Sequence, residues 1–354
     1  MSMPDESEQL EQNLEEDTAI EDEQYVKILR QKLAECRKEK DEYLLGWQRC
    51  KADAINSKQQ EEIKRRDVLQ FAVEDLIESL LPLLDTFRHA LHDKDVQTLE
   101  ERANAMRRDL ILMLTQAGSG HSAGPLDLAD IFAALYFHVL NHRPKQPTWK
   151  HRDRLYLSCG HVCPIQYVAM AHAGYFPKKE LMTLRQLGGR LQGHPEYGVL
   201  PGIENTSGPL GNGSSQACGA AYALRMNGSR SHVYCVMSDG ELQEGITWES
   251  AFFAQKYTLN NMTWIVDRNN IQIDGMTENI MPEEPLRDKF AAFNFHVQEI
   301  DGHNIREFID AVGQAHAVVE RPSVIIAHTI PGKGVGFMEY DYTWHGKPPN
   351  AQEA

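Results

Sequence analysis

The chain contains 354 residues, of which 42% are hydrophobic, and its formal net charge is −15. This length and composition suffice for two globular domains with hydrophobic cores. The acidic balance argues against nucleic acid or an anionic membrane surface as a partner. The sequence contains no run of 18 apolar residues, so it predicts no transmembrane helix.

The N-terminal stretch is strongly acidic. Residues 1–24 hold ten Asp or Glu residues and neither Lys nor Arg, which predicts a disordered tail and is unlike a signal or transit peptide. The six cysteines are scattered through the chain without a Cys-x-x-Cys pair. Free thiols in a reducing compartment are the simplest interpretation, so we expect a cytoplasmic protein.

Residues 25–92 have a helical pattern. Between Val26 and Glu61, mostly apolar residues recur at alternating spacings of three and four, and the positions between them are rich in Lys, Glu and Arg. This heptad stripe predicts a long helix that pairs with a partner as a coiled coil. A second apolar face follows at 68–91, and the polar stretch 92–99 joins this helical arm to the rest of the chain.

A strand–helix–strand unit organises the remaining residues. The apolar run 232–237 stops at Ser238-Asp239-Gly240, and the run 262–266 stops just before Asn269, with a helical segment between them. Open parallel sheets bind ligands at the carboxyl ends of their strands, so we expect Asp239 and Asn269 to lie side by side. A carboxylate, an amide oxygen and a nearby backbone carbonyl suit Mg²⁺ or Ca²⁺ holding a diphosphate.

The residues of this unit carry a family resemblance. The spacing of Asp239-Gly240 and Asn269 resembles the metal and diphosphate signature of thiamine-diphosphate enzymes, and the string DGELQEGITWE resembles the transketolase family, especially the N-terminal subunit of split transketolases. The resemblance implies an α/β thiamine-diphosphate-binding fold over residues 100–354, with a parallel sheet flanked by helices. The alternative is an ordinary sheet end with a solvated Asp and Asn.

The resemblance also implies roles for individual residues, because the motifs of the family follow in its order. Three histidines, in the strings SGH, GHPE and WHGKP, would face the substrate and move protons, and a glutamate would join a proton network at a subunit interface: His121, His194, His345 and Glu244. The cofactor would be held by His161, Gly208, Pro209, Leu210, Asp239, Gly240, Asn269 and His345. The metal would be held by Asp239, Asn269 and the backbone carbonyl of Ile271.

The helical arm resembles a different family. Residues 30–92 are similar to the helical half of GrpE-type nucleotide exchange factors, which serve a heat-shock chaperone ATPase, but the small β domain of that family does not follow. This resemblance implies helical dimerisation or tethering. An unrelated coiled coil is the alternative.

Taken together, these motifs predict an enzyme that transfers a two-carbon ketol unit between sugar phosphates. Because the resemblance covers only the diphosphate-binding domain, we expect a separate C-terminal subunit with the pyrimidine-binding domain, in a homo- or hetero-oligomer. A chaperone cofactor or scaffold with a catalytically silent α/β domain is the alternative function. The related deoxyxylulose-phosphate synthases are disfavoured by the GHPE and WHGKP strings.

Overall fold

The computed structural model describes the backbone of residues 6–354, and the side chains of residues 26–28, 30–62, 64 and 95–354. The chain divides into two compact units, residues 1–89 and 90–354. Helix α1, Glu6–Ala117, contributes to both. The acidic stretch, for which composition predicts disorder, is helical from Glu6 onward, as is the polar stretch 92–99. Glutamate is a good helix former, and acidic residues near a helix N-terminus interact favourably with the helix dipole.

In the first unit, the apolar stripe of α1 is exposed to solvent. Leu33, Tyr43 and Trp47 are 53%, 80% and 61% exposed. The apolar face predicted at 68–91 lies outside the described side chains. Among the described residues, no helix has an apolar stretch sufficient to cross a membrane.

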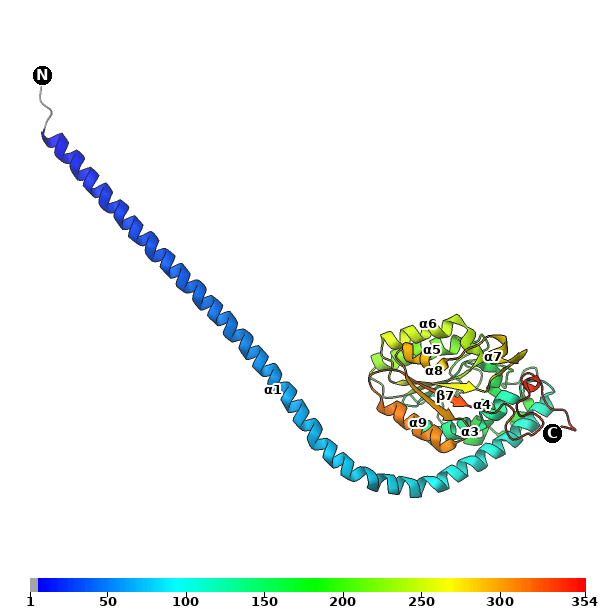
Figure 1. Cartoon of the computed structure of the whole chain (residues 1–354). Helices are drawn as coiled ribbons and strands as arrows, with labels where there is room; N and C mark the ends of the chain where they lie inside the picture. The colour runs from blue at the N-terminus through cyan, green and yellow to red at the C-terminus, as the bar shows by residue number, and fades with distance from the viewer. Residues whose placement is uncertain (1–5) are drawn as a thin grey trace. The chain divides into compact units, whose positions relative to one another are not determined.

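The second unit is built on a five-stranded parallel sheet (Figure 1). Its strand order is β1-β2-β3-β7-β6, and the strands are β1 Arg154–Leu157, β2 Val233–Ser238, β3 Met262–Arg268, β6 His296–Asp301 and β7 Ser323–His328. Strands β2 and β3 are buried along their whole length, as expected for apolar strands of a parallel sheet that is covered on both faces. A two-stranded hairpin, β4 Ile271–Gln272 and β5 Gly275–Met276, follows β3.

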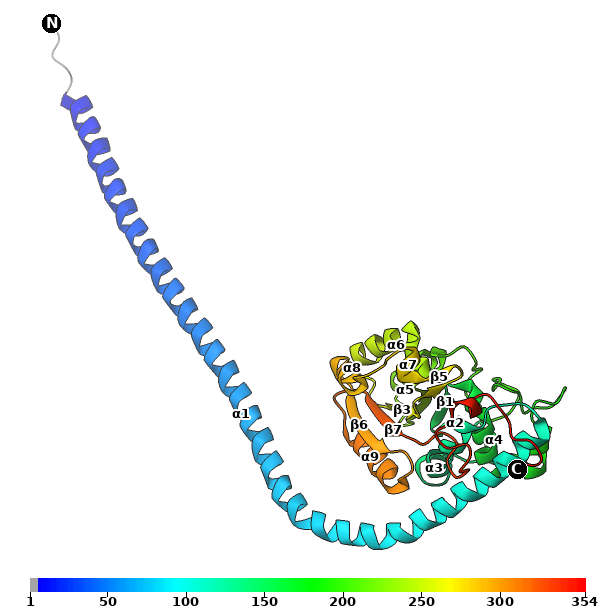
Figure 2. The ribbon, with the colours of Figure 1, turned by 45° about the vertical axis from the view of Figure 1, so that its right-hand side comes forward.

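Helices cover both faces of this sheet (Figures 1 and 2). One face packs against α5 Asn212–Met226, α6 Gly245–Lys256 and α8 Leu286–Ala292, and the other against α3 Ala129–Ala134, α4 Cys163–Ala173 and α9 Ile305–Ala317. Successive residues of a strand point to opposite faces, so Cys235 and Trp264 join one core while Val236 and Ile265 join the other. The predicted α/β fold is confirmed. The remaining elements are α2 Ala123–Asp127, α7 Thr277–Ile280, the π turn Leu135–Val139 and 3₁₀ turns at Gly160–Val162, Lys178–Thr183, Gly240–Gln243 and Tyr342–Trp344.

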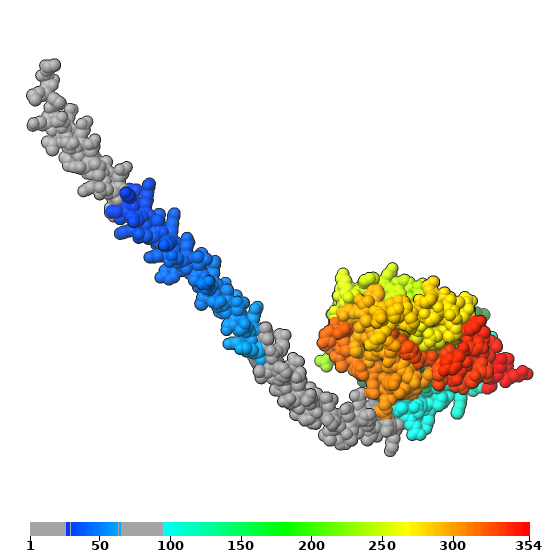
Figure 3. Space-filling model, in the orientation of Figure 1, coloured from blue at the N-terminus to red at the C-terminus, as the bar shows by residue number. Residues whose placement is uncertain are grey.

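The segment after β7 returns to the surface of the second unit, where it forms the red region of Figure 3. Two hydrogen bonds hold it against the start of α2. The Gly332 N–H donates to the carbonyl of Ala123, and the Ser122 hydroxyl donates to the carbonyl of Lys347. This return brings His345 to the carboxyl ends of the strands.

Candidate active site

The loop tips after β2 and β3 adjoin, as the sequence predicts. The two strands pair in parallel, with Ser238 opposite Asp267, so both chains leave the sheet at the same edge. The backbone N–H of Asn270 then donates to Oδ2 of Asp239 at 2.7 Å. Residues that lie 31 positions apart in the chain are therefore in direct contact.

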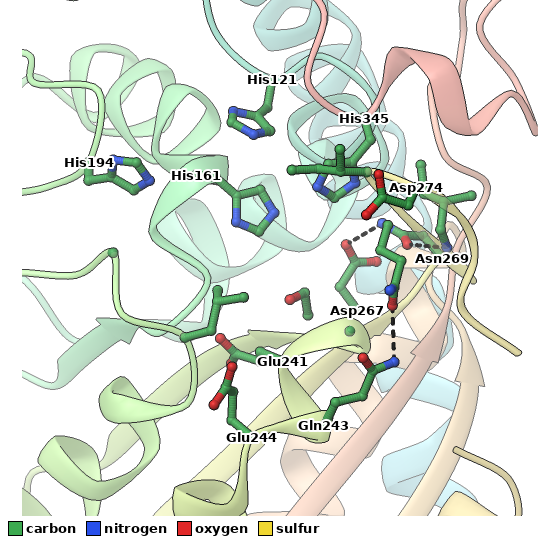
Figure 4. A pocket seen from close by; sticks show the side chains of 17 residues that line it. His121, His161, His194, Glu241, Gln243, Glu244, Asp267, Asn269, Asp274 and His345 are labelled. Atoms are coloured by element: carbon green, nitrogen blue, oxygen red, sulfur yellow. Dashed lines mark hydrogen bonds between the residues drawn. The ribbon is translucent and has the colours of Figure 1, made fainter. Parts of the chain in front are cut away.

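A cavity of about 510 Å³ opens at this edge of the sheet (Figure 4). Ten of the twelve predicted site residues line it, whereas Pro209 and Asp239 do not. The lining also includes residues that sequence reasoning did not select, among them Glu241, Gln243, Asp267, Gln272 and Asp274. One cavity thus collects motifs that are spread from residue 121 to residue 345.

Three imidazole rings form a triangle in the cavity wall (Figure 4). The ring centroids of His121, His161 and His345 are 4.9, 5.1 and 5.5 Å apart. Burial lowers the pKa of His121 and of His345 to about 4, and burial, followed by the neighbouring rings, places the pKa of His161 well below its usual value. The rings are therefore neutral near pH 7, and each offers one donor and one acceptor. Nδ1 of His121 and Nδ1 of His345 are buried and have no hydrogen-bond partner in the described structure.

The fourth predicted histidine, His194, lies apart from this triangle and is exposed. Partial burial lowers its pKa, and the nearby Arg185 guanidinium lowers it further. His194 is therefore neutral as well, at a more open part of the cavity wall.

The histidines are positioned by close packing of the loops that carry them. His161 lies in the turn after β1, directly after Gly160. A Cβ atom at Gly160 would stand 2.7 Å from Oγ of Ser207 and 2.9 Å from the backbone N of Gly208. The absence of a side chain at Gly160 therefore allows the loop at Ser207 and Gly208 to pack against the turn after β1. Gly208 in turn lines the cavity.

Asp239 is fully buried beneath the cavity floor. Its Oδ2 accepts a hydrogen bond from Nη1 of Arg268 at 3.0 Å, and its Oδ1 accepts one from the N–H of Gly240 at 2.7 Å. Burial raises the pKa of Asp239 to about 6, although the Arg268 guanidinium opposes the shift. Arg268 also donates to Glu278 at 2.6 Å and to Glu284 at 3.1 Å. The Gly240 N–H, expected to meet a phosphate, is thus bonded to Asp239 in this structure.

Asn269 lies at the cavity wall, and other side chains fix its amide. Its Nδ2 donates to carboxylate oxygens of Asp127 and Asp267, both at 3.1 Å. Its Oδ1 accepts from the backbone N–H of Ile271, also at 3.1 Å. Burial raises the pKa of Asp267 to about 8 and raises that of Asp127 well above its usual value.

The oxygen atoms at this place fit a divalent cation. Oδ1 of Asp239 and Oδ1 of Asn269 each accept a single hydrogen bond among those described, so each retains a lone pair. Carboxylate, amide and backbone carbonyl oxygens are hard ligands, so Asp239, Asn269 and the Ile271 carbonyl offer the ligand types that Mg²⁺ or Ca²⁺ prefers. Among the residues whose side chains the structure describes, no three His, Cys, Asp or Glu side chains are grouped so that they could hold a metal ion. A cation here would therefore depend on mixed oxygen ligands.

Glu241 is a cavity residue that sequence reasoning missed. Its side chain is fully buried, Oε2 accepts from the N–H of Gly211 at 3.3 Å, and Oε1 has no partner in the described structure. Burial raises its pKa to about 8. The predicted Glu244, in contrast, is exposed. Glu241 lies in the 3₁₀ turn Gly240–Gln243 and Glu244 directly follows it, and both line the cavity, so the string DGELQE offered two candidate glutamates.

Comparisons with known proteins identify the family of the unit that contains the cavity. Residues 99–354 match the model of the transketolase thiamine diphosphate binding domain, and residues 6–118 match the GrpE family. The 6-deoxy-6-sulfo-D-fructose transketolase subunit SqwG of Clostridium sp. is 43% identical over 241 residues, which cover 68% of this chain and 88% of that protein. An apulose-4-phosphate transketolase subunit of Actinobacillus succinogenes is 37% identical over 256 residues, which cover 72% and 92%.

The solved structures agree. The crystal structure of transketolase from Campylobacter jejuni superimposes with a TM-score of 0.67 at 39% identity, over 71% of this chain. The chain spans 40% of the length of that transketolase. The second unit, with the cavity at its strand ends, therefore belongs to the transketolase family, in which it is the thiamine diphosphate binding domain.

Proposed function

We propose that the chain is the N-terminal subunit of a thiamine-diphosphate-dependent transketolase. It would transfer a two-carbon ketol unit between sugar phosphates together with a separate subunit that carries the pyrimidine-binding domain. The observation that carries the proposal is the cavity, because three neutral histidines and Asn269 line it. Asp239 lies at the same sheet edge, where it accepts a hydrogen bond from the N–H of Asn270. Two relatives that match over most of their length are named as subunits, which supports a divided enzyme.

Thiamine diphosphate, when bound, supplies the electron sink that carbon–carbon cleavage beside a carbonyl requires. The protein would hold its diphosphate through Mg²⁺ or Ca²⁺ at Asp239, Asn269 and the Ile271 carbonyl. His161 would donate to a phosphate oxygen, and Gly208, Pro209 and Leu210 would pack beside the cofactor rings.

His121 and His345 carry the proton chemistry in this proposal. Both rings line the cavity, and burial keeps them neutral, so each can accept or donate a proton at a substrate hydroxyl. His194 would bind a hydroxyl at the more open wall. Glu244 would connect the cavity to the partner subunit through its exposed carboxylate. The two relatives are named for a sulfonated sugar and a sugar phosphate, so we place the substrate among sugars with an anionic terminal group and favour the phosphates.

The helical arm supports a second candidate function. The GrpE match over residues 6–118 favours a chaperone cofactor or a scaffold. The exposed Leu33, Tyr43 and Trp47 favour pairing of the arm with another helix as a coiled coil, and hence an oligomer. The free cysteines favour a reducing compartment, so we place the protein in the cytoplasm.

Reconstitution tests the proposal. The full chain is mixed with a pyrimidine-domain subunit, thiamine diphosphate and Mg²⁺, and ketol transfer from a ketose phosphate to an aldose phosphate is followed by chromatography. We expect turnover that requires both chains and that falls by two or more orders of magnitude in His121→Ala, about the share of general acid–base catalysis. Stimulated nucleotide release from a heat-shock chaperone ATPase, without any ketol transfer, would favour the second candidate.

A further inference from the structure

The Asn269 side chain is held by two carboxyl groups that come from distant parts of the chain. Asp127 ends helix α2, 142 positions before Asn269, and Asp267 lies at the end of β3. Each accepts one hydrogen bond from Nδ2 at 3.1 Å. The three side chains are almost completely buried, so water does not compete for these bonds.

This network leaves one orientation for the amide. Nδ2 has two hydrogens, and each is directed at one carboxyl group, while Oδ1 accepts from the N–H of Ile271 at 3.1 Å. A rotation of the amide by 180° would place Oδ1 against two carboxyl groups and Nδ2 against a backbone donor. The N–H of Ile271 would then face another donor, so the oxygen stays on the side of the cavity wall where Ile271 lies.

Asp127 can lie close to this amide because residue 124, a glycine, has no side chain. Gly124 lies in the same short helix, and a Cβ atom there would stand 3.0 Å from Val162 and 3.9 Å from Nδ2 of Asn269. Asp267 is fixed from its other side, because the Thr329 hydroxyl donates to its Oδ1. Asp127 adjoins the carboxyl group of Asp267, to which it is hydrogen-bonded, and its Oδ1 is buried without a donor from any other described group.

The burial of Asp127 therefore needs an explanation beyond stability. Burying two carboxyl groups side by side is unfavourable, and Asn269 is the one described side chain other than Asp267 that is hydrogen-bonded to Asp127. We propose that Asp127 is a positioning residue: together with Asp267 it fixes the Asn269 amide so that Oδ1 points at the divalent cation that holds the cofactor's diphosphate. This inference rests on the proposed function, because it requires that Asn269 bind the cation.

The test measures cation affinity directly. Mn²⁺, which shares the octahedral oxygen preference of Mg²⁺, is titrated into the full chain together with its pyrimidine-domain subunit and saturating thiamine diphosphate, and free Mn²⁺ is counted by electron paramagnetic resonance. We expect Asp127→Ala to weaken Mn²⁺ binding about 10-fold or more, the usual effect of losing a group that orients a metal ligand. Asp127→Asn keeps an acceptor oxygen for Asn269 and should bind within about 3-fold of wild type, a small part of that effect.

The control is Asp288→Ala, which removes an exposed carboxylate. Near-ultraviolet circular dichroism without cation confirms that each variant is folded. Equal affinity of Asp127→Ala and wild type would overturn the inference, as would an Asp127→Asn variant that binds as weakly as Asp127→Ala. Failure of the wild-type chain to bind Mn²⁺ with thiamine diphosphate would instead overturn the proposed function, and the inference with it.

Discussion

Replacing Glu241 by glutamine should stabilise the protein, and by more as the pH rises. The carboxyl group is fully buried, and burial raises its pKa from an ordinary value of 4.5 to about 8. The folded state therefore retains a proton that the unfolded chain releases above pH 4.5. Folding must take up this proton, so the wild-type free energy of unfolding decreases as the pH rises from 4.5 to about 8.

The size of the effect follows from the pKa difference. One unit corresponds to about 1.4 kcal/mol, so the wild type should lose about 3 kcal/mol between pH 5.5 and pH 8 through this residue. Glutamine does not titrate and keeps the acceptor oxygen that faces the Gly211 N–H. The advantage of Glu241→Gln over wild type should therefore grow by about 3 kcal/mol across this range. Asp267 and Glu283 also have pKa values raised by burial to about 8. Both residues are present in the wild type and in the variant, so their contributions to the pH dependence cancel in the difference.

Urea unfolding at pH 5.5, 7 and 8 measures this difference. Near-ultraviolet circular dichroism reports on the second unit through its buried aromatic side chains, such as Trp264. Glu249→Gln, an exposed change on α6, should shift stability by less than about 0.5 kcal/mol at every pH. A constant difference between Glu241→Gln and wild type from pH 5.5 to pH 8 would refute a protonated buried Glu241.

Two further predictions concern packing and thiol exposure. Gly213→Ala should destabilise the second unit by about 1–3 kcal/mol, because a Cβ atom there would stand 2.5 Å from Cα of Ser158. Gly219→Ala in the same helix should be neutral or stabilising, because a Cβ atom there would have nothing within 4 Å. Equal melting temperatures of the two variants would contradict this packing. Thiol titration of the native chain should detect two reactive cysteines, Cys36 and Cys50, because the other four are buried. All six should react after denaturation. More than two fast-reacting thiols in the native chain would contradict the burial of these four cysteines.

The strand ends could be predicted from sequence because their pattern is local. The apolar runs before Asp239 and Asn269 are continuous and end in polar residues, and parallel pairing then requires the two tips to adjoin. The contact between Asn270 and Asp239 agrees with this prediction. The histidines of the cavity lie far apart in the chain, so no periodicity links them, and they were found through the motifs of the family.

Burial at the site could not be predicted in the same way. Glu241 lies in the turn Gly240–Gln243 and Glu244 directly follows it, yet the first is buried and the second is exposed. The loop at Gly211, whose N–H donates to Glu241, decides which carboxyl group is covered. Asp127 lies 142 positions from the amide that it contacts, so no local pattern links the two residues. The ion pair between Asp239 and Arg268 likewise joins the end of β3 to the loop after β2, and no local sequence pattern predicts it.

Titration calorimetry of thiamine diphosphate into the full chain, with its pyrimidine-domain subunit present, is the most direct test of the central claim. The titration is carried out with Mg²⁺, then with EDTA in place of Mg²⁺, and again with the variant Asn269→Ala. We predict saturable binding that requires Mg²⁺, disappears in EDTA and weakens at least about 10-fold when the amide ligand is removed. Binding that is equally tight in EDTA and in Asn269→Ala, or no binding at all, would contradict a cation clamped between the ends of β2 and β3.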